Sequence, residues 1–220
     1  MRGYLKSKAK LNETNFLTVS GISVVIKDPI DFDMSTGDLK GTLENLPSHF
    51  LSDIDYIIFG EFDFLKKKGY NAAYMDGAIY ASNSQEDNLN VMDDIIHEIG
   101  HSVEEKYKNF VYSDMEVERE FLKKRSQLQK EFETSGISLP KEKMQNAEHD
   151  TELDMYFSQV IGYPTMTTLS QGIFYSPYGA TSLREYFANG FEAYFFHRDM
   201  YLKKVSPILF NKLEKLETGG

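Results

Sequence analysis

The sequence contains no cysteine and no tryptophan among its 220 residues. Without cysteine, the chain has no disulfide framework, thiolate zinc finger, iron–sulfur cluster or cysteine nucleophile. Any bound metal must therefore be held by His, Asp, Glu or Tyr. No run of about 18 uncharged apolar residues occurs, so we expect no membrane-spanning segment and no membrane partner.

Positive charge is also scarce, with 24 Lys and Arg against 34 Asp and Glu and a net charge of −10. Such a chain is poorly suited to a phosphate backbone, so nucleic acid is not an expected partner. The start of the chain carries Arg2, Lys6, Lys8 and Lys10 but lacks the apolar core and cleavage site of a signal peptide. We expect residues 1–13 to be a basic flexible arm and the protein to be soluble, either in the cytoplasm or as part of a phage particle.

Apolar residues make up 41% of the chain and include 16 Phe and 14 Tyr, enough to fill a core. The length suits one domain, residues 1–220, with room for an insertion. Strands come first along the chain and helices follow, which predicts an α+β fold. Strands are expected over 16–26 and 54–62, and a hairpin over 72–82 with its turn at Asp76 and Gly77. Helices are expected over 42–51, 91–107, 113–134, 141–161, 182–196 and 201–216.

The helix over 91–107 carries the motif His97-Glu98-Ile99-Gly100-His101, with Asn90 as its expected N-cap. Residues four apart share one helix face, so both imidazoles can bind one Zn²⁺ at about 2.0–2.1 Å. Glu98 is turned away from the two ligands but can reach a water in the open coordination position, as a general base must. The competing interpretation is two exposed histidines flanking a glutamate in an acidic helix.

A catalytic zinc needs a third protein ligand from elsewhere in the chain. The extended motif HExxHxxGxxH is excluded because Glu104 and Tyr107 stand where it requires Gly and His. A carboxylate on a later helix is the remaining option, with His149 a distant alternative. The competing carboxylates are Glu116, Glu118, Glu120, Glu185 and Glu192.

The segment YGATSLREYFA, residues 178–188, together with the HExxH motif resembles the catalytic domain of the anthrax lethal factor family, which includes the Pro-Pro endopeptidases. The resemblance covers roughly 72–107 and 174–196. It implies a gluzincin, an HExxH zincin in which Glu185 is the third zinc ligand and Tyr178, seven residues earlier, donates to the oxyanion. A capping box at Ser182 is the competing interpretation of Glu185.

The sequence departs from the family in two places. Asn189 stands where the family has a carboxylate that supports the metal ligands, and Glu192 or Asp94 could supply that carboxylate instead. The next residue, Gly190, weakens the helix that carries Glu185. Some 70 residues also separate the HExxH helix from Tyr178, so residues of about 108–172 are expected to be a helical insertion beside the cleft. We expect this insertion to govern access or partner choice.

These observations predict a zincin-like core, with a small mixed sheet, an HExxH helix and C-terminal helices, that hydrolyses peptide bonds. The protein or peptide substrate is expected to pair with an exposed edge strand at Ala78–Ser82. The alternative function is a non-proteolytic interaction protein on a zincin scaffold, such as a component of a phage particle or a toxin-like assembly. An assembly partner would then bind the insertion at 108–172 or the N-terminal arm.

Overall fold

The computed structural model describes residues 16–32 and 36–219, so the predicted arm at 1–13 lies outside the described residues. The chain forms two compact units that meet in sequence between Ser102 and Val103. The expected single domain with an insertion at 108–172 stays a prediction. Within the described residues, no helix is both long enough and apolar enough to cross a membrane.

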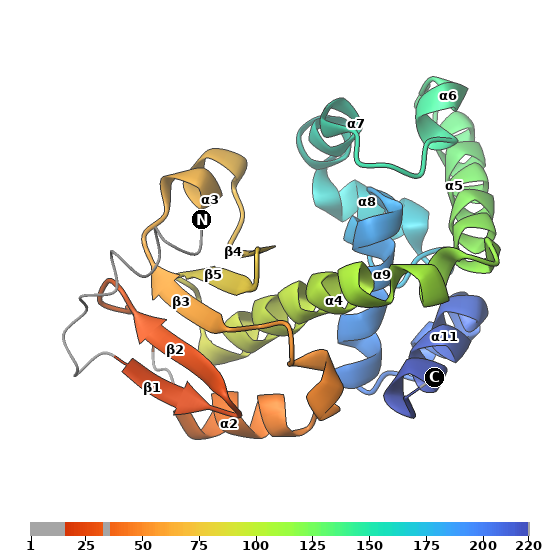
Figure 1. The fold of residues 1–220 in the computed structure, drawn as a ribbon. Helices are drawn as coiled ribbons and strands as arrows, with labels where there is room; N and C mark the ends of the chain where they lie inside the picture. The colour runs from red at the N-terminus through yellow and green to blue at the C-terminus, as the bar shows by residue number, and fades with distance from the viewer. Residues whose placement is uncertain (1–15, 33–35, 220) are drawn as a thin grey trace. The chain divides into compact units, whose positions relative to one another are not determined.

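The first unit contains a five-stranded mixed sheet in the order β1-β2-β3-β5-β4 (Figure 1). Strands β2, β3 and β5 run parallel, whereas β1 and β4 pair antiparallel with β2 and β5. The sheet and the helices that follow it confirm the mixed α+β class. The strands are β1 (Phe16–Val19), β2 (Ile22–Ile26), β3 (Tyr56–Gly60), β4 (Ala72–Met75) and β5 (Ala78–Ser82).

Two tight turns shape the sheet. The prediction of one strand over 16–26 is wrong, because Ser20 and Gly21 both have positive φ, 51° and 84°, and form a two-residue hairpin turn between β1 and β2. The hairpin predicted over 72–82 is confirmed, with Asp76 and Gly77 at φ values of 49° and 80°.

The predicted edge position of Ala78–Ser82 is wrong. Strand β5 pairs with β3 on one side and β4 on the other, so β4 is the outermost strand at this end of the sheet. The physical reason is burial: Ala78, Ile79 and Ala81 are fully buried, as in the interior of a parallel sheet. Any strand added at this end must therefore pair with β4.

Helices of the first unit begin earlier than the sequence predicts. The helix expected over 42–51 is α2, Thr36–Glu44, and it ends before Pro47, whose ψ of 130° is not helical. Helix α4, Asn88–Tyr112, is capped by Asp87, whose carboxylate accepts a hydrogen bond from the Asn90 amide at 2.9 Å, so the predicted Asn90 cap is wrong. The other helical segments of this unit are η2 (Ser48–Phe50) and α3 (Asp63–Lys68).

The second unit is helical. The long helix expected over 113–134 is confirmed as α5, whereas the single helix expected over 141–161 is wrong because Asp150 caps a new helix through the Leu153 amide. Pro207, which lacks an amide hydrogen, likewise divides the helix expected over 201–216. After α4 come α5 (Glu116–Thr134), α6 (Lys141–Met144), α7 (Thr151–Met155), the π-helix η3 (Tyr156–Gly162), α8 (Tyr163–Ser170), η4 (Tyr178–Ala180), α9 (Leu183–Phe195), α10 (Tyr201–Val205) and α11 (Pro207–Glu217).

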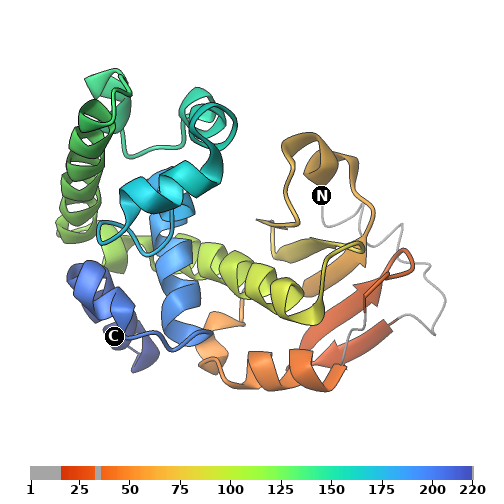
Figure 2. The same cartoon turned by 180° about the vertical axis from the view of Figure 1, so that it is seen from behind.

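Gly190 lets two helices of this unit approach closely. Helices α9 and α11 lie side by side in both views (Figures 1 and 2). A Cβ atom at Gly190 would overlap Cδ2 of Leu209 and lie 3.2 Å from its Cγ. The glycine that weakens α9 by its helix propensity is therefore required by tertiary packing.

We expect Gly190→Ala to lower the free energy of unfolding by up to about 2 kcal/mol, because an overpacking cost of about 1–3 kcal/mol against Leu209 outweighs the gain of about 1 kcal/mol from the better helix propensity of alanine. The matched control is Gly41→Ala in α2, where an added Cβ meets nothing within 4 Å. That change should stabilise the protein by about 0.5–1 kcal/mol. Urea unfolding of both variants measures the difference, and a stabilised Gly190→Ala protein would contradict the packing argument.

Candidate metal centre

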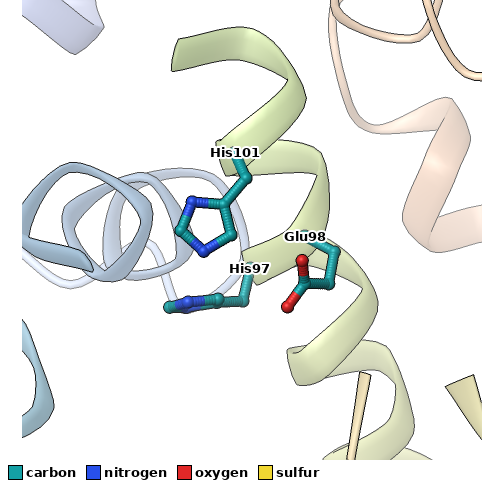
Figure 3. Close-up of side chains that lie close together, drawn as sticks. All are labelled: His97, Glu98 and His101. Carbon is teal, nitrogen blue, oxygen red and sulfur yellow. The ribbon is translucent and has the colours of Figure 1, made fainter. Parts of the chain in front are cut away.

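His97, Glu98 and His101 lie together on α4. One ligand atom from each residue lies within 4.8 Å of the other two, and Figure 3 shows the three side chains projecting from neighbouring turns of the helix. The two imidazole rings stand almost perpendicular, at 86°, with centroids 4.9 Å apart. Imidazole nitrogen and carboxylate oxygen are donors that Zn²⁺ takes, so the three residues fit the predicted metal.

Burial holds the motif in place. Ile95, Ile96 and Ile99 on the same helix are buried, which fixes the rotation of α4. Glu98 and His101 are themselves only 8% and 5% exposed, and His97 is half-buried. Polar groups buried to this extent need partners, and a metal ion bound by both imidazoles would be one such partner.

Glu98 has a second partner on the edge strand. Its Oε2 accepts a hydrogen bond from the Tyr74 amide at 2.6 Å. The Ser82 backbone amide donates to the Asn71 carbonyl at 2.7 Å, so these two residues form a hydrogen-bonded pair of the antiparallel ladder. Hydrogen-bonded and non-hydrogen-bonded pairs alternate along such a ladder, and Tyr74 therefore belongs to a non-hydrogen-bonded pair whose amide points away from β5. The outer edge of β4 and the motif glutamate therefore lie side by side. Sequence reasoning missed Tyr74 because a backbone donor leaves no signature in a side-chain pattern.

Asp94 lies one helical turn before His97. Burial raises the pKa of Asp94 to about 7, and the charge of the neighbouring His97 opposes this rise. Carboxylates close to a metal-binding imidazole commonly orient it. That Asp94 or Glu192 substitutes for the carboxylate missing at Asn189 stays a prediction.

Glu185 and Tyr178 lie in the second unit, Glu185 in the first turn of α9 and Tyr178 in η4. Both side chains are half-buried. The HExxH motif lies in the first unit, so a metal centre that unites the two sets stays a prediction. The Ser182 cap is present, with its hydroxyl accepting from the Glu185 amide at 3.1 Å. This bond uses the backbone of Glu185, so the cap and a ligand role are compatible.

Two of the competing ligands are engaged elsewhere. Glu120 is buried and accepts hydrogen bonds from the Tyr186 hydroxyl and the Ile208 and Leu209 amides at 2.8–3.0 Å, which caps α11. Glu192 lies 3.3 Å from Nε2 of His197. The Glu120 carboxylate is thus committed to the core of the second unit and is the weakest of the original candidates.

Asn189 has a structural role that could not be read from the sequence. It is buried, and its Oδ1 accepts from the Ser176 hydroxyl at 2.9 Å. The same oxygen would lie 3.0 Å from a Cβ at Gly179, so the amide packs directly against η4. Asn189 therefore supports the turn that carries Tyr178.

Comparisons of the chain with protein-family models, with curated protein sequences and with solved structures find no match. The resemblance to the lethal factor family therefore stays a prediction carried by the residues themselves.

Proposed function

We propose that the protein is a zinc-dependent endopeptidase of the gluzincin type, with a zincin-like core resembling that of the lethal factor family. The observation that carries the proposal is the clustering of His97, Glu98 and His101 within 4.8 Å on one buried helix. Two imidazoles and a neighbouring carboxylate supply two of the three protein ligands of a catalytic zinc and a group that can move a proton beside it.

His97, His101 and Glu185 would hold the zinc, which when bound polarises a carbonyl and lowers the pKa of water towards neutral. Glu98 accepts the proton of the attacking water and passes it to the leaving amine. The hydrogen bond from the Tyr74 amide to Oε2 restrains the orientation of the Glu98 carboxylate, and this limits the directions in which Oε1 can point. Tyr178 donates a hydrogen bond to the developing oxyanion.

The substrate is an extended peptide that adds a strand to the outer edge of β4, Ala72–Met75, in place of the edge first predicted at Ala78–Ser82. Support comes from the position of Glu98 beside this edge. Because Glu98 occupies the Tyr74 amide, a paired peptide would use the other outward-facing groups of the strand, the Ala72 amide and the Ala72 and Tyr74 carbonyls. A peptide paired along this edge would run past the proton-accepting group.

Metal analysis tests this proposal. Purified wild-type protein should contain one equivalent of zinc, and His97→Ala should lose it because a single imidazole and one carboxylate bind zinc far more weakly. Wild-type protein should also cleave a degenerate peptide library, and chelation should stop the cleavage. Absence of zinc from both proteins would contradict the proposal, and zinc without cleavage would favour the interaction-protein alternative.

A further inference from the structure

Arg125 is the largest fully buried side chain of the described residues. Every hydrogen bond recorded for its guanidinium ends on a backbone carbonyl. Nε donates to Ala180 at 2.8 Å and Nη2 to Thr181 at 2.7 Å, and Nη1 donates to Lys143 at 3.2 Å and Asn146 at 2.6 Å. The side chain therefore joins two separate backbone segments to the middle of α5.

The first of these segments is the one that carries the predicted catalytic groups. Ala180 and Thr181 lie between Tyr178 and Glu185, at the end of η4 and just before α9. Two bonds from one rigid guanidinium fix the direction of the backbone at this point. Tyr178 and Glu185 each lie within a few residues of these carbonyls.

The second segment leads to the same place. Lys143 and Asn146 belong to the end of α6 and the turn after it, and the next carbonyl, that of Ala147, accepts a hydrogen bond from the Leu183 amide at 2.8 Å. Leu183 is the first residue of α9. Arg125 thus fixes the start of α9 both directly and through this loop, while Asn189 supports η4 from within α9 itself.

A buried cation of this kind specifies how its acceptors are arranged. Burial lowers the pKa of Arg125 to about 10, with Asp150 opposing the change, so the group remains charged at neutral pH. The guanidinium also lies over the ring of Phe121, 5.0 Å from its centroid. Apolar replacements for buried charges are often neutral or stabilising, whereas a charged fork specifies the arrangement of its acceptors.

We propose that Arg125 is a positioning residue that holds Tyr178 and Glu185 in the geometry the zinc centre requires. The inference rests on the proposed function. It also assigns a task to the predicted insertion at 108–172: its helix α5 and the loop after α6 form the support of the catalytic segment, in addition to any part in access.

The experiment compares Arg125→Lys with Lys124→Met in the full-length protein. A lysine ammonium is a single point and cannot span both pairs of carbonyls. Lys124 is the matched control because it is a buried cation on the same helix that donates to the Ile173 and Val205 carbonyls, outside the 178–187 segment. It meets that segment at the Tyr186 ring, 5.5 Å from its centroid, and a methionine side chain can still pack on this ring. Hydrogen exchange, zinc affinity and steady-state kinetics are measured for both variants.

Arg125→Lys should accelerate amide exchange over 178–187, weaken zinc binding by about tenfold or more, and lower kcat by about 10–100-fold with little change in KM. Lys124→Met should lose stability but keep wild-type exchange over 178–187, zinc affinity and kcat. Equal behaviour of the two variants in these three measurements would overturn the role of Arg125. Absence of zinc from the wild-type protein would instead overturn the proposed function.

A second variant keeps the inference testable if Arg125→Lys does not fold. Leu183→Pro removes the amide that bonds to Ala147 and exchanges the half-buried leucine side chain for a proline ring. The helix should accept the change, because proline is tolerated at the first position of a helix and Ser182 already has the extended backbone that precedes proline, with φ −157° and ψ 167°. This variant should fold and show the same three changes to a smaller degree. A folded Leu183→Pro protein with wild-type exchange over 178–187 and wild-type zinc affinity would overturn the inference.

Discussion

Glu98→Gln is expected to leave one equivalent of zinc bound while lowering kcat by about 10²–10⁴-fold or more. The amide oxygen of glutamine can still accept the hydrogen bond from the Tyr74 amide, so the side chain keeps its place beside β4. Glutamine cannot accept a proton from water near neutral pH, and the proposed hydrolysis loses its general base. Metal content and peptide hydrolysis, measured on the same preparation, separate the two effects.

The control for this change is Glu105→Gln, an exposed glutamate on the same helix four residues beyond His101. It removes the same charge and should change hydrolysis far less than Glu98→Gln, by no more than a few-fold, because water of high dielectric constant weakens the field of an exposed charge. Full activity of Glu98→Gln would show that another group accepts the proton. Loss of zinc from Glu98→Gln would show that Glu98 is itself a ligand.

Glu185→Gln is expected to weaken zinc binding by more than about 100-fold, since even groups behind the ligands change metal affinity by about 10–100-fold. The helix start should survive, because the bond to Ser182 comes from the Glu185 amide and the side chain keeps its size. Hydrolysis at saturating zinc should also fall, since a glutamine oxygen is a poorer ligand than a carboxylate. Competition with a chromophoric chelator measures the zinc affinity.

Two further variants decide between Glu185 and its rivals. Glu118→Gln in α5 and Glu192→Gln in α9 remove carboxylates that the sequence alone left open, and both should keep wild-type zinc affinity. Glu192 is also bonded to His197, so its loss tests whether that pair contributes. A Glu118→Gln protein that loses zinc while Glu185→Gln retains it would transfer the third ligand to α5.

Local features of the fold could be read from the sequence where neighbouring residues decide them. The turn at Asp76 and Gly77 and the helix around His97 follow from backbone preferences and from periodicity over a few residues. Errors arose where one residue changed the local geometry. Ser20 adopts positive φ before Gly21, and Asp150 starts a new helix, although neither breaks the apolar pattern of its segment.

The candidate site also contains features set by local sequence and features set by tertiary packing. The approach of His97, Glu98 and His101 depends only on helical spacing, so the sequence by itself determined that these three side chains cluster. Tertiary structure decided the rest. It made β4 rather than β5 the outer strand, placed the Tyr74 amide on Glu98, and used Glu120 to cap α11.

Arg125 and Gly190 show the physical reason for this division. The carbonyls that Arg125 binds lie 18–56 residues away in the chain, and the side chain that Gly190 accommodates is Leu209 on another helix. Backbone preferences act over one to four residues and specify helices, turns and motifs on a single helix. Contacts between distant segments depend on how the elements pack, and packing decided which strand is outermost and which buried cation binds the backbone before α9.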